Sequence, residues 1–281
     1  MRLAPVAVER IVVAMLWIMA AITVGVLLFI ITFILAHGLP HVSWGFLTES
    51  PGKMGREGGI FPMIVATALV AGIAVTLAAP IGVATAIYLT EYTREGRLTA
   101  AIRFGADCLA GIPSIIYGLF GFVFFAITLG LGLCVLSGAL ALALMVLPTI
   151  IRTSEEAIRA VPPAYREVSY GLGSTRWQMV TRVVLRSALP GIVTGIVLSL
   201  ARCVEETAVV MLTAGSAMRL ACSPFDSCRP LSLHFYILSR EGISMEKAYA
   251  TAAVLVIVIL VINFFAYWLM HRFIGKAGRH V

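Results

Sequence analysis

The chain has 281 residues, of which 60% are hydrophobic and only 12% are charged. Soluble domains carry about 25% charged residues, so a surface covered by water is excluded at this length. The net charge of +7 does not require nucleic acid as a partner, because the basic residues flank long uncharged segments and so act as topology signals.

Six segments are long and apolar enough to cross a lipid bilayer as helices. A membrane helix needs roughly 20 apolar residues for a hydrocarbon core about 30 Å thick. Runs of this length exclude a membrane β-barrel, whose strands have about 10 residues of alternating polarity. We therefore predict an all-α polytopic membrane protein with about six transmembrane helices, near residues 11–36, 60–89, 104–127, 134–151, 190–214 and 248–270.

The first segment follows Arg2 and Arg10 and is too long for the apolar part of a signal peptide, so we expect a retained helix. In the third segment, Pro113 with Gly111 and Gly118 marks either a bend or kinked packing. Most Lys and Arg residues lie at the two termini and in the second and fourth connecting loops. This excess predicts that both termini are cytoplasmic.

The loop after the fourth segment carries a helical pattern of its own. Pro162 and Pro163 should end the preceding helix. A short helix is expected over 164–172, followed by a turn at Gly173, where glycine permits a positive φ. Ser174 is the expected N-cap of a second helix. The apolar stripe of that second helix would consist of Trp177, Val180, Val184 and Ala188.

This loop resembles the EAA loop of bacterial ABC-importer permeases. Glu167-Val168-Ser169 stands for the Glu-Ala-Ala of that family, and Gly173 follows at the family's spacing, whereas Arg186 replaces its Pro. The resemblance implies a coupling helix that docks on an ATPase subunit. It assigns this coupling to Arg166, Glu167, Ser169 and Gly173. An amphipathic helix lying at the membrane interface is the simpler alternative.

Further segments resemble the phosphate importer permeases of the PstA type. They are GGIFPMIVATALV from Gly58, PIGVATAIYLTEY from Pro80, AGIPSIIYGLFGF from Ala110, LPTIIRTSEEAIRAVP from Leu147 and SLARCVEETA from Ser199. The resemblance implies a type I, MetI-like permease fold in the bacterial cytoplasmic (inner) membrane. It divides the chain into an N-terminal helix with an external loop (1–57) and a permease core (58–281), whose coupling loop lies near 153–190.

The resemblance also implies the partners of such an importer. They are the lipid bilayer, a second permease subunit of the PstC type, two ATPase subunits of the PstB type and a periplasmic phosphate-binding protein of the PstS type. ATP and Mg²⁺ would be bound by the ATPases, because this chain contains no Walker A pattern. We therefore expect a transport subunit that is not an enzyme and holds no cofactor or metal of its own.

Charged residues interrupt the fifth segment, where an ionised side chain costs at least about 2.5–3.5 kcal/mol. The PstA-type pattern Arg-x-x-Gly-Glu-Thr-Ala-Pro is matched by Arg202, Glu206 and Thr207, while Glu205 replaces its Gly. Both glutamates are expected on the helix face of Arg202, at i+3 and i+4. We predict that the substrate path contains Arg202, Glu205, Glu206 and Thr207.

The pairing of a guanidinium with a carboxylate suits phosphate. The guanidinium donates to anionic oxygens, and the carboxylate accepts a hydrogen bond from the P–OH group that phosphate keeps at neutral pH and that sulfate lacks. The alternative is an ion pair that only fixes helix packing. A permease for phosphonate, molybdate or sulfate, or a non-transporting phosphate-sensing component, remains the alternative function. An intramembrane enzyme is disfavoured because the expected spans contain no His.

Cys222 and Cys228 fall together in the expected external loop. In an oxidising compartment they either close a disulfide or remain free thiols. We expect no metal site there, because no His or further Cys lies close to them in the sequence.

Overall fold

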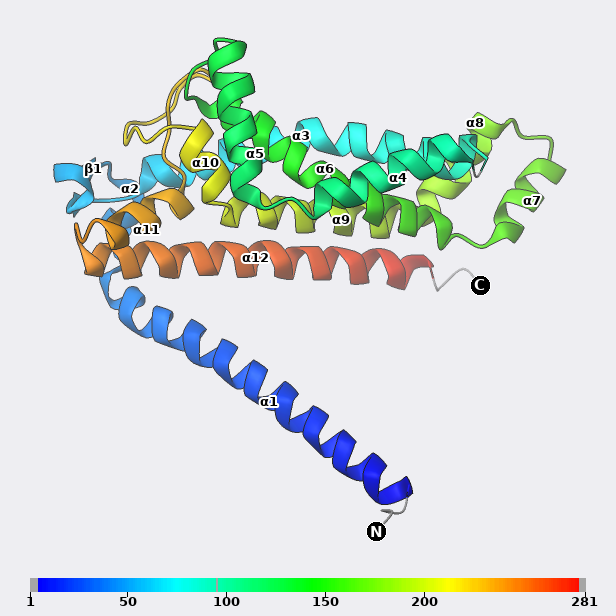
Figure 1. Ribbon diagram of the computed structural model, residues 1–281, viewed down its shortest axis with the longest axis horizontal. Coiled ribbons are helices and arrows are strands. Elements are labelled where there is room, and N and C mark those ends of the chain that lie inside the picture. Colours follow the sequence, from blue (N-terminus) through cyan, green and yellow to red (C-terminus); the bar gives the residue numbers. More distant parts are fainter. Residues whose placement is uncertain (1–4, 95, 278–281) are drawn as a thin grey trace.

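The computed structural model describes residues 5–94 and 96–277, and this part of the chain is mostly helical (Figure 1). Its one sheet within that range pairs the antiparallel strands β1 (Pro51–Gly52) and β2 (Glu57–Gly58). The α-helices are α1 (Pro5–Gly38), α2 (Trp44–Thr48), α3 (Phe61–Ile87), α4 (Arg97–Ala110), α5 (Ser114–Gly121), α6 (Val135–Arg159), α7 (Pro163–Gly171), α8 (Arg176–Met179), α9 (Leu185–Glu205), α10 (Ala208–Thr213), α11 (Leu231–Arg240) and α12 (Met245–Ala277). Short 3-10 helices are η1 (Leu39–His41) and η2 (Lys53–Gly55), and π-helical segments are η3 (Tyr88–Tyr92), η4 (Phe122–Thr128) and η5 (Val180–Val184).

Five continuous helical segments in the described residues are long and apolar enough to span a membrane. They are Val12–His41, Phe61–Tyr92, Val135–Arg159, Arg176–Glu205 and Met245–Trp268. A sixth crossing arises if α4 and the segment Ser114–Thr128, which meet at an angle of 99°, count as one broken span. The predicted number of about six is therefore confirmed, and the span expected near 104–127 is the broken one.

The break in the third span has a local cause. Pro113 adopts an extended backbone with ψ near 139°, and its ring nitrogen has no proton to donate to a continuing helix. The hydroxyl of Tyr117 in α5 donates to the carbonyl of Leu109 in α4 over 2.7 Å, which ties the two arms together. Of the two sequence interpretations for Pro113, the structure therefore has the bend.

The fifth span also differs from its expected range. It begins at Arg176, well before residue 190, and ends at Glu205. Arg176, Arg182 and Arg186, which made a start near residue 190 the expectation, lie on the polar N-terminal end of this continuous helix. After Glu206 and Thr207 the chain resumes as the short helix α10. Four charges used for the orientation, those of Arg2, Arg272, Lys276 and Arg279, lie outside the residues or side chains that the structure describes.

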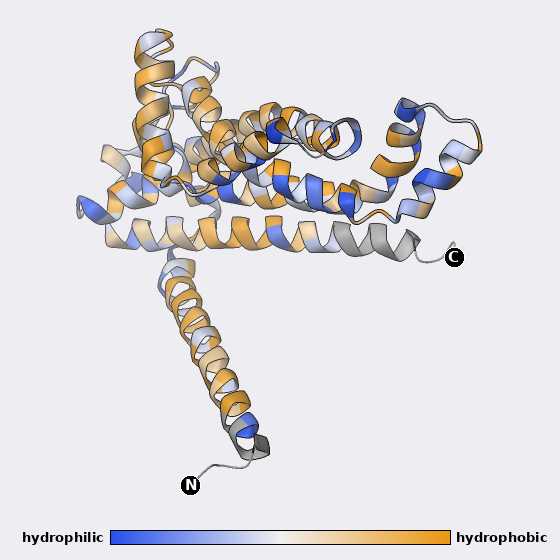
Figure 2. Ribbon diagram, turned by 45° about the vertical axis from the view of Figure 1, so that its right-hand side comes forward, coloured by the Kyte–Doolittle hydropathy of each residue, from blue (hydrophilic) through white to orange (hydrophobic). Residues whose placement is uncertain are grey.

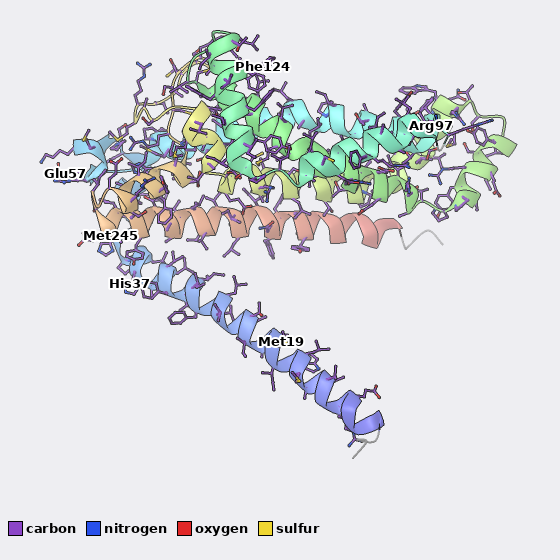
Figure 3. All side chains as sticks on the ribbon, in the orientation of Figure 1. Met19, His37, Glu57, Arg97, Phe124 and Met245 are labelled. Atoms are coloured by element: carbon purple, nitrogen blue, oxygen red, sulfur yellow. The ribbon has the colours of Figure 1, made fainter. Side chains whose placement is uncertain are left out.

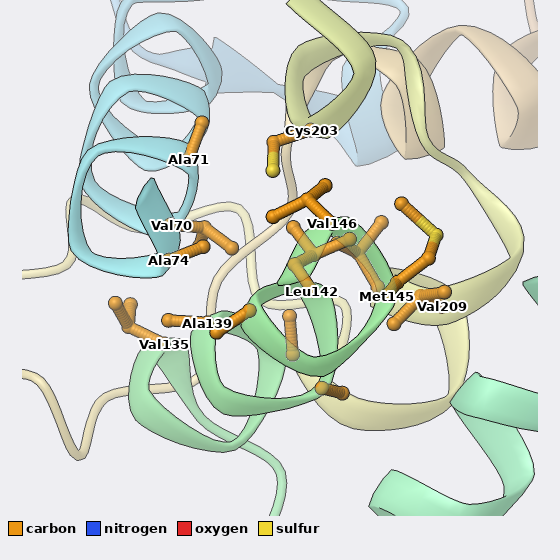
Figure 4. Packing of buried hydrophobic residues seen from close by; sticks show 14 of the residues in the cluster. Val70, Ala71, Ala74, Val135, Ala139, Leu142, Met145, Val146, Cys203 and Val209 are labelled. Carbon is orange, nitrogen blue, oxygen red and sulfur yellow. The ribbon is translucent and has the colours of Figure 1, made fainter. Parts of the chain in front are cut away.

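Helices α3, α6 and α9 enclose the main core, and α12 packs along α9. Figure 4 shows side chains of α3, α6, α9 and α10 meeting in this core. Small residues permit the close approach. A Cβ at Gly82 would lie 2.7 Å from Ile150, and one at Gly121 would lie 2.6 Å from Ala141. Such contacts are typical of membrane helices, whose association depends on close packing.

Helix α1 contacts the bundle only near the C-terminal end of the helix, and the rest of α1 extends away from the bundle (Figure 1). The rings of Phe33 and His37 lie 6.1 and 5.5 Å from that of Tyr249 in α12, and Figure 3 shows His37 beside the start of α12 at Met245. The remainder of α1 is apolar along its length (Figure 2) and exposes large side chains such as Trp17 and Phe29. Such a surface requires lipid or another membrane helix around it.

Candidate functional site

A cavity of about 510 Å³ lies between the α4–α5 bend and helices α6, α9 and α12. This volume is within the range of about 300–1,000 Å³ that is usual for small-molecule sites. We call it the central cavity. Its lining residues are Leu109, Ala110, Ile112, Tyr117, Met145, Thr149, Leu198, Ala201, Arg202, Glu205 and Asn263.

Two of the four residues predicted for the substrate path, Arg202 and Glu205, line the central cavity. Both are exposed on the surface of this chain. Within the described residues, no hydrogen bond or ion pair occupies the Arg202 guanidinium. A guanidinium of this kind offers planar, paired donors to the oxygens of an anion.

The other two predicted path residues lie at the break after α9. Glu206 is the C-cap residue of α9, and among the described residues no hydrogen bond or ion pair joins its carboxylate to Arg202. Its carboxylate accepts the Ala208 N–H over 3.1 Å, and its carbonyl accepts the Ser232 hydroxyl over 2.8 Å. Thr207 is the N-cap residue of α10. The Glu206 carboxylate thus compensates the free N–H groups at the start of α10.

Sequence reasoning missed three polar residues of the central cavity: Tyr117 from α5, Thr149 from α6 and Asn263 from α12. The Tyr117 hydroxyl is already committed to the Leu109 carbonyl. Asn263 is the only asparagine in the sequence. Its place inside an otherwise apolar span was the signal available, because polar groups in such spans are costly and mark functional positions.

At the other end of α9, helices α7 and α8 form a hairpin, which we call the α7–α8 hairpin (Figure 1). Helix α7 confirms the helix expected over 164–172, and Gly173 makes the predicted turn with φ of +81°. The N-cap of α8 is Thr175, which forms a capping box with Gln178. The expectation for Ser174 is therefore wrong, because its hydroxyl turns back and donates to the Ser169 carbonyl over 2.7 Å.

One face of the α7–α8 hairpin is buried and the other is free. Met179, Val180 and Val184 pack in a small core against Ile158 at the end of α6. Trp177, expected in the same stripe, is instead 66% exposed, as are Val168 at 64% and Leu172 at 83%. An apolar face of this kind at a helical tip is typical of a protein interaction site. Glu167 is exposed beside it.

Arg166 points the opposite way, into the protein. Its guanidinium donates to the Glu91 carboxylate from Nη2 over 2.7 Å and from Nε over 3.1 Å. It also donates to the carbonyls of Val161 and Ile158 over 2.8 and 3.0 Å. The side chains of Glu91 and Arg166 are only 7% and 22% exposed. Arg166 therefore fixes the hairpin to the end of the α3–η3 helix from inside.

The two loop cysteines are free thiols in the structure. Cys222 is exposed, whereas Cys228 is buried and donates its N–H to the Ala214 carbonyl. Burial raises the pKa of the Cys228 thiol to about 12. The Asp226 carboxylate between them accepts the backbone N–H groups of Cys222 and Ser223, each over 2.9 Å. In the part of the chain that is described, no cluster of His, Cys, Asp or Glu forms a metal site.

Comparison with known sequences places this architecture among transport proteins. Residues 78–277 match the family described as binding-protein-dependent transport system inner membrane component. Over 227 residues the chain is 38% identical to the phosphate transport system permease protein PstA 1 of Mycobacterium tuberculosis, covering 80% of this chain and 73% of the relative. It is 32% identical to the phosphate transport system permease protein PstA of Xylella fastidiosa, covering 85% and 84%.

Solved structures show the same fold at low sequence identity. A bacterial alginate ABC transporter, crystallised with an alginate-bound periplasmic protein, matches with a TM-score of 0.65 and 16% identity over 91% of this chain and 94% of that one. The MetNI methionine ABC transporter in an inward-facing conformation matches with a TM-score of 0.60 and 20% identity over 76% and 94%. The expected all-α, MetI-like permease fold is confirmed, and the chain belongs to the family of inner membrane components of binding-protein-dependent transport systems.

Proposed function

We propose that this chain is a permease subunit of an ATP-driven importer and forms part of the path for inorganic phosphate. The observation that carries the proposal is the central cavity, which is lined by the guanidinium of Arg202 and the carboxylate of Glu205; among the described residues the guanidinium makes no hydrogen bond or ion pair within 4 Å. Ionised groups within membrane spans are costly, face cavities or partners, and mark substrate pathways. The similarity to phosphate transport permeases supports phosphate as that ligand.

The importer would contain three further kinds of subunit: a PstC-type permease, two PstB-type ATPases and a PstS-type periplasmic phosphate-binding protein. ATP and Mg²⁺ would be held by the ATPases, so this chain would not itself be an enzyme. We place the complex in the bacterial inner membrane with both termini and the α7–α8 hairpin in the cytoplasm. Residues 1–57 would then form an N-terminal membrane helix with an external loop, and residues 58–281 would form the permease core.

Uptake of labelled phosphate by the assembled importer in liposomes tests the transport role. Arg202→Gln removes the charge and should abolish most uptake, whereas Arg202→Lys keeps the charge without the paired donors and should retain part of it. Arg219→Gln is the matched control, because Arg219 is 72% exposed and only 3.6 Å from Asp226 in a loop. Normal uptake by Arg202→Gln would refute the proposed path.

Competition separates phosphate from the other oxyanions. Unlabelled phosphate should suppress uptake at much lower concentrations than phosphonate, molybdate or sulfate. Glu205 on the cavity wall favours an anion that carries a proton, since a carboxylate accepts a hydrogen bond but repels a fully ionised dianion. Stronger suppression by sulfate or molybdate than by phosphate would assign the chain to another oxyanion.

We further propose that the exposed face of the α7–α8 hairpin contacts an ATPase subunit. Glu167, Ser169 and Gly173 keep the spacing of the coupling loop, while the apolar contact would come from Val168, Leu172 and Trp177. Leu172→Asp and Glu167→Lys should therefore weaken co-purification of the ATPase. Met54→Asp is the control, because Met54 is a 73% exposed apolar residue in η2, outside the hairpin. Equal co-purification of all three variants would contradict the contact.

A further inference from the structure

Within the described residues, the hydroxyl of Thr149 makes no hydrogen bond, unlike the other threonines of the packed membrane helices; Thr32, on the exposed part of α1, also makes none. In helices, threonine hydroxyls commonly donate to the carbonyl four residues earlier. In the described parts of α3, α6, α9, α10 and α12, Thr149 alone among the threonines makes no hydrogen bond with its side chain. The threonines that do donate in this way are Thr67, Thr76, Thr85, Thr153, Thr194, Thr213 and Thr251.

Asn263 in α12 likewise has a polar side chain without a hydrogen bond in the described part of the chain. Its amide makes no hydrogen bond with the described residues, although it lies within a membrane span and is partly buried. Its neighbours on both sides are apolar, from Ala252 to Ala266. An amide that is withdrawn from water without a partner is unfavourable by about 1–3 kcal/mol. Both unpartnered residues line the central cavity that also holds Arg202.

The three groups have complementary chemistry. The guanidinium of Arg202 can only donate, whereas the Thr149 hydroxyl and the Asn263 amide can each donate and accept. Phosphate at neutral pH presents both acceptor oxygens and at least one P–OH donor. Sulfate presents only acceptors. The cavity wall thus carries one cation, the Glu205 carboxylate and two groups that both donate and accept, and this set matches the protonated tetrahedral oxyanion better than the fully ionised one.

We propose that Thr149 and Asn263 contact the transported anion in the central cavity and, with Arg202, select a protonated oxyanion. The proposal rests on the proposed function, and it assigns the substrate contacts to α6 and α12 in addition to α9. The Thr149 hydroxyl and the Asn263 amide take the place of water molecules that would otherwise hydrate the anion as it passes. Apolar side chains of Met145, Leu198 and Ala201 also line the cavity.

The test uses the complete importer, reconstituted in liposomes with its partner permease, ATPases and binding protein. Uptake of labelled phosphate and ATP hydrolysis stimulated by the loaded binding protein are measured together. Thr149→Val and Asn263→Leu each remove a hydrogen bond to a charged ligand, so the maximal uptake rate should fall about tenfold or more. ATP hydrolysis should persist, so that the ATP hydrolysed per phosphate rises by a similar factor.

Matched variants separate contact from packing. Thr149→Ser keeps the hydroxyl and should transport within about twofold of the unaltered chain. Thr194→Val makes the same substitution at a threonine whose hydroxyl donates to the Pro190 carbonyl, and it should leave the ratio of ATP to phosphate unchanged. If Thr149→Val fails to assemble, Asn263→Leu carries the test alone.

The results that would overturn the inference differ from those that would overturn the proposed function. If Arg202→Gln abolishes uptake while Thr149→Val and Asn263→Leu transport normally, the two contacts are refuted and the importer role stands. If uptake and ATP hydrolysis fall together in assembled variants, the residues are structural and the inference is again refuted. If the unaltered complex imports no phosphate, the proposed function itself fails.

Discussion

The ion pair between Arg166 and Glu91 should hold the α7–α8 hairpin against the rest of the protein. The Arg166→Gln substitution removes three hydrogen bonds to Glu91 and two to backbone carbonyls. It also leaves the Glu91 carboxylate, 7% exposed, without its cation. Removing one partner of a buried pair costs about 3–5 kcal/mol. Since each 1.4 kcal/mol is a factor of ten, local opening of the hairpin should become about two to three orders of magnitude more frequent.

Amide hydrogen exchange of residues 160–180, read by mass spectrometry, measures this opening directly. The double variant Glu91→Gln/Arg166→Gln should be less affected than Arg166→Gln alone, because it leaves no buried charge. Lys53→Gln is the matched control. It removes an ion pair with Glu57 whose side chains are 70% and 60% exposed, and such pairs contribute at most about 1 kcal/mol. If Arg166→Gln changes exchange no more than Lys53→Gln changes its own loop, the reasoning is wrong.

Three further predictions follow from the loops. Gly173→Val should destabilise the α7–α8 hairpin by about 1–2 kcal/mol through its backbone alone, because φ is +81° and an added Cβ would meet open space; unchanged exchange protection in the hairpin would contradict this. Cys222 should react with a maleimide at neutral pH while Cys228, buried and with its pKa raised to about 12, stays a protonated thiol and reacts only after unfolding; equal labelling of both, followed by peptide mapping, would refute the assignment. The pKa of Asp226 is lowered by the N–H groups of Cys222 and Ser223, so its contribution to loop order should be complete above the unfolded pKa of about 3.9 and be lost as the pH falls through the lower folded value. Asp226→Asn should lose that contribution at every pH, and loop proteolysis measured from pH 3 to 7 would show whether it does.

The membrane helices could be predicted from the sequence because their cause is composition. A run without charge fixes the existence of a span, and the positions of α1, α3, α6 and α12 follow from such runs. Composition does not show, however, where a span bends or breaks. The 99° bend at Pro113 and the break at Glu206 depend on which backbone groups find partners, so the sequence left a bend or kinked packing open at Pro113 and did not predict the break at Glu206.

Only the charged residues of the candidate site could be predicted from the sequence. Arg202 and Glu205 are conspicuous in an apolar segment, and both line the central cavity. Thr149 is one of several threonines in the packed helices α3, α6, α9, α10 and α12, and it differs from them only in that their hydroxyls make hydrogen bonds. Asn263 lies far from Arg202 in the chain, and no spacing rule connects them. In the α7–α8 hairpin, Arg166 was predicted by motif position to take part in coupling, but its inward direction is a property of tertiary packing.

The π-helical segment η5 allows the helix that leaves the α7–α8 hairpin to change its register by rotation. Each π turn holds one residue more than an α turn, and an α-helix advances about 100° per residue. Converting η5 to α geometry would therefore rotate α8 relative to α9 by about that angle without breaking the helix, because η5 joins α8 to α9. The helix that enters the membrane after the hairpin thus contains a register step, and a displacement of the hairpin can be accommodated by rotation about the helix axis rather than by bending.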